Sequence, residues 1–328
     1  MNPLKRFIDD LGRTPVVPLM GLPGIQLTGI SINEALFNAQ NQISSLLALS
    51  RAVQPDALFT MMDLTVEAEF LGSDLKLSDE DLPAVSGHIL EDEADLEVIF
   101  GDKPTGGRMA LFAEVVSGLK DELDIPVCAY VIGPLTLAGE LMDITVVMKA
   151  TRKNPELLHR VLANSTRVIM GYASLLENAG ADLICILEPS AVMMSAKIYW
   201  EFSGRYCSKI ISEGIAGMSV LHICGDTNHL IAEMAKTGAN GLSLDKQVDL
   251  PSANDCMGGD TVLIGNIDPV SVVNFDDEEM VKRKSRALYR SMNARNNFIL
   301  STGCDVPPNA PIENLVAMMQ AADDSGGV

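Results

Sequence analysis

One histidine and two cysteines in this chain have the types and the surroundings of metal ligands. His222 and Cys224 end the apolar run "SVLHICG" (219–225), and side chains two apart in a strand point to the same face. Cys304 has a similar place, near the end of the run "FILSTGCDV" (298–306). One imidazole and two thiolates suit zinc, and three protein ligands leave a fourth tetrahedral position for a substrate. The alternative is a core histidine with two cysteines packed as hydrophobic residues.

Eight short apolar runs alternate with longer stretches of helical periodicity along the chain. The apolar runs cover residues 16–21, 57–64, 127–134, 183–189, 219–225, 241–246, 262–269 and 298–306. The helical stretches between them include residues 33–53, 154–180 and 276–294. Strands that are apolar on both faces and alternate with helices are typical of parallel sheets. The sequence therefore predicts an α/β fold, a (β/α)8 TIM barrel, with a doubly wound open sheet as the alternative.

No linker or low-complexity segment divides the chain, so we expect residues 1–328 to form a single barrel domain. The longest departure from the alternation of strands and helices is residues 65–105, a stretch rich in acidic residues. It follows the second apolar run. We expect it to form an acidic excursion, either an active-site loop or a cap over the barrel.

Polar residues end most of the apolar runs. A TIM barrel requires this pattern, because its active site lies at the carboxyl ends of the strands. Asp63 ends the second run and Glu188 the fourth, and both are candidate catalytic residues. Asp245 and Asp268 end the sixth and seventh runs. Since Asp is favoured in turns and at helix N-caps, a structural role is the simpler interpretation for these two, and it stays open for Asp63 and Glu188.

The composition argues against several classes of partner. The formal net charge is −20, which disfavours nucleic acids and anionic membranes as partners. No apolar run approaches the roughly 20 residues that span a bilayer, and the first residues contain no long apolar segment, so we expect a cytoplasmic protein. Six cysteines are too few for a disulfide framework in 328 residues. We expect Cys128, Cys185 and Cys207 to be packed in the core.

Several longer motifs make the sequence similar to a known family. They are "MDLTVEAEFLG", "VIGPLTLAGELMD", "LHICGD", "GNIDP" and "STGCDVPPNAPIENL". Over essentially its whole length, the chain resembles the uroporphyrinogen decarboxylase superfamily, and within it the corrinoid-dependent methyltransferase branch that includes the methylcobamide:coenzyme M methyltransferases. The most specific part is the His-x-Cys pair with the later Gly-Cys. The resemblance implies that His222, Cys224 and Cys304 bind Zn2+.

The same resemblance implies a cobamide as the second cofactor. The corrinoid-binding signature Asp-x-His-x-x-Gly is absent from the sequence. The cobamide would therefore be supplied by a partner, a separate corrinoid protein that docks over the mouth of the barrel. A thiol has a pKa of about 8.5 and is mostly protonated at neutral pH, whereas a thiol that coordinates zinc is deprotonated.

These features predict a zinc-dependent methyltransferase that moves a methyl group from a methylcobamide to a thiol such as coenzyme M. The alternative is a demethylase that moves a methyl group from a small methylated substrate, such as a methyl ether or a methylamine, to the corrinoid. A zinc site can support both directions, as a Lewis acid or as a thiolate ligand. A non-catalytic binding protein for the corrinoid partner is a third possibility.

The decarboxylases themselves are the rival within the superfamily. Their substrate carries many carboxylates, and the family holds it with an arginine pair just after the first strand. Here no Lys or Arg occurs from Thr14 through Ser50. Burying carboxylates without a cationic partner is costly, so we expect no decarboxylase activity. Asp63 nevertheless falls where the decarboxylases keep an essential aspartate.

Overall fold

Seven of the eight apolar runs contain the strands of one parallel sheet. The computed structural model describes residues 2–101, 106–257, 260–292 and 295–323. The strands are neighbours in chain order, β1-β4-β5-β6-β7-β8-β9. They are β1 (Leu58–Phe59), β4 (Val127–Ile132), β5 (Leu183–Leu187), β6 (Met218–Ile223), β7 (Gly241–Leu244), β8 (Val262–Ile267) and β9 (Phe298–Thr302). A doubly wound sheet reverses its strand order at one point. This sheet has no reversal, so the doubly wound alternative is wrong.

The first apolar run closes the curled sheet without forming a full strand. Val16 makes an isolated parallel bridge to Leu300 of β9. The amide of Val17 donates to the Leu300 carbonyl at 2.8 Å, and on the other side the amide of Asp56 donates to the Val16 carbonyl at 3.2 Å. Proline has no N–H to donate, and Pro15 and Pro18 flank this pair of valines, which limits the pairing. The α/β barrel is confirmed, with a short segment in its eighth position.

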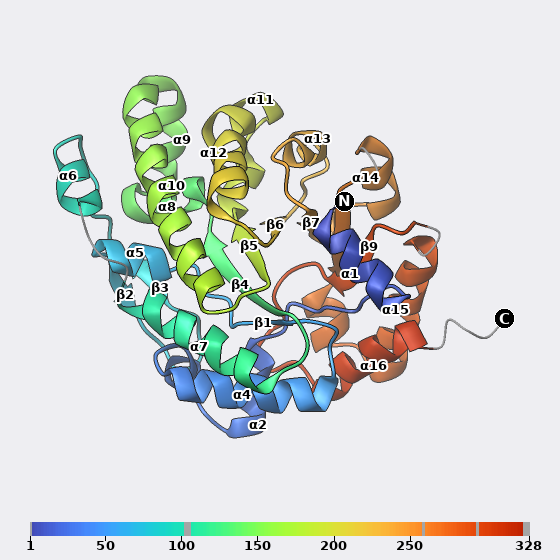
Figure 1. Ribbon diagram of the computed structural model, residues 1–328. Coiled ribbons are helices and arrows are strands. Elements are labelled where there is room, and N and C mark those ends of the chain that lie inside the picture. Colours follow the sequence, from blue (N-terminus) through green and yellow to red (C-terminus); the bar gives the residue numbers. More distant parts are fainter. Residues whose placement is uncertain (1, 102–105, 258–259, 293–294, 324–328) are drawn as a thin grey trace.

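Helices surround the strands, as Figure 1 shows. The longer ones are α1 (Pro3–Leu11), α4 (Ala39–Val53), α7 (Arg108–Glu122), α8 (Pro134–Met142), α9 (Ile144–Lys153), α10 (Pro155–Asn178), α15 (Glu278–Met292) and α16 (Ile312–Asp323). The shorter ones are α2 (Ile25–Thr28), α3 (Ile32–Leu36), α5 (Val66–Leu71), α6 (Asp95–Phe100), α11 (Ala196–Tyr199), α12 (Arg205–Lys209), α13 (Ile231–Ala235) and α14 (Leu250–Cys256). Five further helical turns are η1 (Leu22–Gly24), η2 (Pro189–Met193), η3 (Trp200–Gly204), η4 (Ile210–Gly214) and η5 (Pro269–Asn274). Among the described residues, we find no helix with the length and apolar character needed to cross a membrane.

The helical stretches predicted from the sequence are present, with one division. Residues 33–53 split into α3 and α4, because the side chain of Asn38 accepts a hydrogen bond from the amide of Asn41 and caps the second helix. The stretch 154–180 becomes α10, which the Asn154 side chain caps in the same way. The stretch 276–294 becomes α15, and its last two residues lie outside the described part of the chain.

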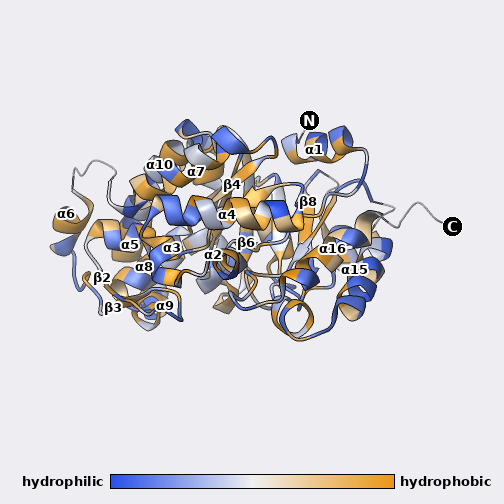
Figure 2. Ribbon diagram, turned by 90° about the horizontal axis from the view of Figure 1, so that it is seen from below, coloured by the Kyte–Doolittle hydropathy of each residue, from blue (hydrophilic) through white to orange (hydrophobic). Residues whose placement is uncertain are grey.

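The buried side chains form two layers, one inside the barrel and one between the sheet and the helices. Alternate residues of the strands, such as Phe59, Tyr130 and Leu187, point into the barrel, whereas their neighbours pack against the helices. Leu4 and Ile8 of α1 belong to the inner cluster and cover the amino ends of the strands. Most helices carry both hydrophilic and hydrophobic residues, as Figure 2 shows. Helix α1 thus leaves the carboxyl ends of the strands as the open mouth of the barrel.

The acidic excursion contains structure of its own. Its described part includes α5, α6 and an antiparallel hairpin of β2 (Asp74–Lys76) and β3 (Ala84–Ser86). Residues 102–105, at its predicted end, lie outside the described residues. Helix α5 places Glu67 in the interior, where its carboxylate accepts a hydrogen bond from the amide of Ile132 at 2.8 Å. Burial raises the pKa of Glu67 to about 8, although this hydrogen bond acts in the opposite direction.

We expect Glu67→Gln to flatten the pH dependence of stability between about pH 4.5 and about pH 8. In the folded wild type, Glu67 keeps its proton up to about pH 8, whereas in the unfolded chain it loses the proton near 4.5. Its contribution to the free energy of unfolding is therefore complete below pH 4.5 and is lost as the pH rises through 8. Urea unfolding at several pH values will measure the effect. Glu278→Gln, at an exposed position of α15, is the control, and identical pH profiles for the two variants would contradict this role of Glu67.

Candidate metal centre

Two strands that are not neighbours supply the three ligand candidates. His222 lies in β6 and Cys224 directly after it, whereas Cys304 follows β9. Strands β7 and β8 lie between them, and in a flat sheet three strand spacings amount to about 14 Å. In this curled sheet the Sγ atoms of Cys224 and Cys304 are 3.1 Å apart. Closure of the barrel therefore assembles the site.

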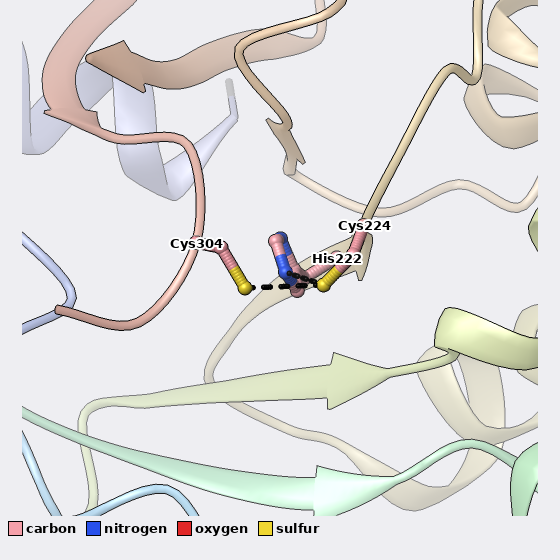
Figure 3. A group of neighbouring side chains, drawn as sticks. All are labelled: His222, Cys224 and Cys304. Carbon is pink, nitrogen blue, oxygen red and sulfur yellow. Dashed lines mark hydrogen bonds between the residues drawn. The ribbon is translucent and has the colours of Figure 1, made fainter. Parts of the chain in front are cut away.

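The three side chains point toward one another, as Figure 3 shows. Nε2 of His222 lies 3.0 Å from Sγ of Cys224. All three ligand atoms are within 4.8 Å of one another, and no other group of His, Cys, Asp or Glu in the described ranges converges as closely. His222 is 1% exposed, and both cysteines are partly buried. The convergence at the barrel mouth that the sequence predicts is therefore present.

Ser243 fixes the orientation of the His222 ring. Nδ1 of His222 lies 3.0 Å from Oγ and 3.2 Å from the carbonyl oxygen of Ser243. A carbonyl can only accept, so Nδ1 carries the proton and Nε2 is free to donate its lone pair. None of the sequence motifs above includes Ser243. The register of the parallel sheet pairs Ser243 in β7 with His222 in β6, so a polar residue in the neighbouring run was the available signal.

The glycines beside the two cysteines are required by the backbone. Gly225 follows Cys224 with φ of 88°, a left-handed conformation that side chains disfavour. Gly303 precedes Cys304, and a Cβ atom there would come within 2.6 Å of the amide nitrogen of Lys246. The chain can therefore bring both cysteines to the mouth only with glycine in these positions.

The two thiols shift each other's pKa in opposite directions. The hydrogen bond from Cys224 lowers the pKa of Cys304, although burial opposes it. The same hydrogen bond and then burial raise the pKa of Cys224 above its ordinary value. A coordinating metal ion removes the proton from its thiol ligands, so metal binding at this site would release a proton.

Asp63 lies in a cluster of ion pairs that the sequence analysis did not anticipate. Its Oδ1 accepts hydrogen bonds from the amide and the hydroxyl of Thr65 at 2.8 and 2.7 Å, and its Oδ2 pairs with Arg108. Arg108 also pairs with Glu69, and its guanidinium group lies 4.4 Å from the centre of the Phe37 ring. Arg108 is thus a buried cation near Asp63, but two carboxylates already neutralise it.

The carboxylate of Glu188 accepts three hydrogen bonds within the protein. It is fully buried, and its two carboxylate oxygens accept from the amides of Leu135 and Thr136, both at 2.9 Å. These amides belong to the first turn of α8, where free N–H groups favour a carboxylate. The hydroxyl of Ser203 donates to Glu188 at 2.8 Å, and Cys207 lies beside it at 4.0 Å. Burial raises the pKa of Glu188, and the hydrogen bonds partly offset this rise.

The remaining strand-end aspartates stabilise turns. Asp268 caps η5 by accepting from the amides of Val270 and Ser271, and it pairs with Lys246 at 2.6 Å. Burial raises the pKa of Asp268, but the hydrogen bonds outweigh it and hold the pKa at about 2. Asp245 accepts from the amide two residues further on, at 3.2 Å. The structural interpretation of both residues is confirmed.

Three cysteines outside the cluster are buried, as expected. Cys128 and Cys185 point into the barrel, whereas Cys207 packs in the outer layer.

Asp305 and Tyr130 stand out among the polar groups near the cluster. Asp305 directly follows Cys304, and its two carboxylate oxygens are buried without a hydrogen-bond partner. The hydroxyl of Tyr130 is also buried and unpartnered. Burial, followed by the charge of Asp305, raises the pKa of Tyr130 well above its ordinary value. Buried polar groups normally have hydrogen-bond partners, so these two groups depart from the usual pattern.

Comparison with known proteins identifies the family. Residues 9–325 match the family described as Uroporphyrinogen decarboxylase (URO-D). The chain belongs to this family. Among its relatives, the methylcobamide:CoM methyltransferase MtbA of Methanosarcina acetivorans is 28% identical over 275 residues, which cover 81% of this chain and 79% of MtbA. The methylcobamide:CoM methyltransferase MtaA of Methanosarcina barkeri is 28% identical over 268 residues, 80% of this chain and 77% of MtaA. A uroporphyrinogen decarboxylase of Thermus thermophilus is 25% identical over 272 residues, 81% of this chain and 78% of the enzyme.

Two solved structures have the same fold. A methyltransferase from Methanosarcina mazei superimposes with a TM-score of 0.86 over 96% of this chain and 95% of its own, at 24% identity. A B12-independent methionine synthase from Shewanella superimposes with a TM-score of 0.65 over 94% of this chain and 97% of its own, at 15% identity. At these identities the matches establish the fold, and both agree with the barrel described above.

The residues at the mouth fit a zinc ion. The donor set is one imidazole nitrogen and two sulfurs, the soft and borderline ligands that zinc selects. Nδ1 of His222 is hydrogen-bonded to the carbonyl oxygen of Ser243, and a ligating histidine usually has such a partner on its second nitrogen. Bonds of about 2.0 to 2.3 Å to one zinc ion keep its ligand atoms within a few ångströms of one another, as they are here.

We expect the purified protein to hold about one zinc ion per chain and Cys304→Ala to lose most of it, since a three-ligand site depends on each thiolate. Metal content after dialysis against a zinc buffer will measure this. Cys256→Ala removes an exposed cysteine outside the cluster and should keep full occupancy. Full zinc content in a triple replacement of His222, Cys224 and Cys304 would refute the site.

Ser243→Ala should weaken zinc binding by about 10-fold to 100-fold, the usual effect of losing the partner that orients a ligating histidine. Competition with a chelator of known affinity will measure the change. Ser212→Ala, which removes an exposed hydroxyl, is the matched control. An unchanged affinity in Ser243→Ala would mean that the backbone carbonyl alone orients His222.

Proposed function

We propose that this protein is a zinc-dependent, corrinoid-linked methyltransferase. It moves a methyl group between a methylcobamide, carried by a separate corrinoid protein, and a thiol such as coenzyme M. The convergence of His222, Cys224 and Cys304 at the mouth of the barrel is the observation that carries this proposal. The similarity to methylcobamide:CoM methyltransferases supports the corrinoid and the thiol as the two reactants.

The three ligands define what the chain contributes to the chemistry. When bound, zinc supplies a positive charge that deprotonates a substrate thiol at neutral pH. The two cysteine thiolates balance much of that charge, so the substrate sulfur stays rich in electrons. In the transfer, the carbon–sulfur bond forms while the cobalt–carbon bond breaks. Its electron pair stays on cobalt, which passes from cobalt(III) to cobalt(I), and the thiol proton goes to solvent.

Other residues of the mouth hold the reactants. We propose that the unpartnered carboxylate of Asp305, which directly follows Cys304, and the unpartnered hydroxyl of Tyr130 bind polar groups of the substrate. Asp63 and Glu188, which the sequence predicts as catalytic, fit better as positioning residues. The carboxylate of Asp63 is occupied by Arg108 and Thr65, and that of Glu188 by the first turn of α8. Each holds a segment that follows a strand and contributes to the mouth.

Methyl transfer to or from free cobalamin tests the function. We expect the zinc-loaded protein to convert methylcobalamin to cob(I)alamin when a thiol is present, because the thiol ionises at the metal centre. Anaerobic ultraviolet-visible spectroscopy against a panel of thiols, methyl ethers and methylamines will follow the cobalt state. Removal of zinc, or Cys304→Ala, should lower the rate by at least about 100-fold, on the scale of losing a principal catalytic group. Cys256→Ala should keep the wild-type rate.

Each other outcome of this assay selects a different function. Methylation of cob(I)alamin by a methyl ether or a methylamine, without thiol-dependent demethylation, would establish the demethylase. Turnover of uroporphyrinogen would establish the decarboxylase and overturn our proposal. Corrinoid binding without methyl transfer in either direction would leave a binding protein.

A further inference from the structure

The exposed apolar side chains of this protein are concentrated at one end of the barrel. Nine large apolar side chains are exposed among the described residues. Eight of them lie in connections that leave the carboxyl end of a barrel strand or strand-like segment, for example Leu77, Met193 and Phe275. The ninth, Leu11, ends helix α1 at the opposite end. Single exposed apolar residues are ordinary, but such a one-sided distribution marks a surface for a partner.

A hollow on this rim is lined in part by the loop that follows Cys304. Its volume is about 630 Å³, and three segments line it. Isoleucines 25, 30 and 32 come from the chain between the first apolar run and α4, and Pro308 comes from the loop that carries Cys304. The side-chain amide of Gln26 donates to the carbonyls of Pro308 and Ala310, each at 2.8 Å, and joins the wall of the hollow to this loop. A group seated in the hollow therefore contacts the loop that carries Cys304.

The third wall of the hollow is acidic. Asp79 and Glu80, from the loop between β2 and β3, line it, and Asp81 follows them on the surface. Residues 65–105 contain twelve acidic and two basic residues, a formal charge of −10 out of −20 for the chain. Half of the net charge thus lies in the excursion to which this hairpin belongs. A second copy of the chain, or an anionic surface, would be repelled there.

From these observations we propose that the hollow and the β2–β3 hairpin form the docking surface for the corrinoid protein, and that its matching surface presents an apolar side chain flanked by lysines or arginines. This inference rests on the proposed function. The methyl group must reach the three ligands at the mouth, and this chain lacks the Asp-x-His-x-x-Gly signature that would let it carry the corrinoid itself. A protein that brings cobalt to the mouth has to contact the rim. Complementary charge then sets the rate of encounter, and the apolar contact holds the complex.

Charge reversal at the hairpin tests the electrostatic part. Glu80→Lys with Asp81→Lys reverses two exposed charges beside the hollow, and Glu278→Lys with Glu279→Lys makes the same change in net charge on α15. Rates of methyl transfer are measured with two donors, a purified corrinoid protein charged with methylcobalamin, taken from a panel, and free methylcobalamin. At about 50 mM salt, the KM for the corrinoid protein should rise about 10-fold in the hairpin variant and less than about 2-fold in the α15 variant, and the difference should shrink at about 0.5 M salt. Both variants should use free methylcobalamin at the wild-type rate.

A pair of leucine variants tests the apolar part. Leu77, in the loop of the hairpin, is 49% exposed, and Leu11, at the other end of the barrel, is 38% exposed. Leu77→Asn should weaken binding of the corrinoid protein by about 5-fold to 10-fold, the effect of removing one partly buried leucine from an interface. Leu11→Asn should leave binding unchanged. Biolayer interferometry will measure both affinities.

Several results would overturn the docking surface. Equal effects in the hairpin and α15 variants would do so, as would unchanged binding in Leu77→Asn together with an unchanged KM in the hairpin variant. A wild-type protein that demethylates free methylcobalamin but binds no corrinoid protein of the panel would also do so. If neither donor gives methyl transfer, the proposed function fails, and binding of the corrinoid protein to the variants still decides the docking surface separately.

Discussion

The pairing of Val16 with Leu300 is the contact on which the site depends. This bridge, together with the hydrogen bond from Asp56 to the Val16 carbonyl, turns a seven-stranded sheet into a ring. The interior is then filled by alternate side chains of the strands, and α1 seals the amino ends. In a flat sheet, β6 and β9 would lie about 14 Å apart, and the thiols of Cys224 and Cys304 would not meet. The chemistry at the mouth is thus a consequence of barrel closure.

The sequence predicts the barrel and the ligand cluster because both follow from short-range patterns. Strands buried on both faces appear as continuous apolar runs, and helices as stretches of helical periodicity, so their order is readable without a structure. The ligands sit where such runs end, and a parallel barrel collects these ends at one mouth. His222 and Cys224 needed only the alternation of side chains in one strand. Predicting that Cys304 lies near them also required a closed barrel, which the eight apolar runs indicate.

Contacts between the side chains of distant segments could not be predicted from the sequence. Arg108 follows Asp63 by 45 residues, and no local pattern indicates that it pairs there with two carboxylates. The partners of Glu188 are amides of α8, whose first turn lies 52 residues before it. The weak pairing of the first apolar run is different, because Pro15 and Pro18 are visible in the sequence and explain it. The apolar pattern indicates where a strand lies, whereas the backbone N–H groups available for pairing limit its length.

The separation of the ligands along the chain has a consequence for folding. Cys224 and Cys304 are 80 residues apart, and the segment between them contains β7, β8 and β9 with the helices that connect them. In an unfolded chain only the local His-x-Cys pair is close together. An ion that binds all three residues therefore stabilises the folded state, in which β6 to β9 are already assembled. The ion would link the ends of β6 and β9 and so stabilise the last part of the barrel to be synthesised. Metal supply during synthesis would then influence the yield of folded protein as well as its activity.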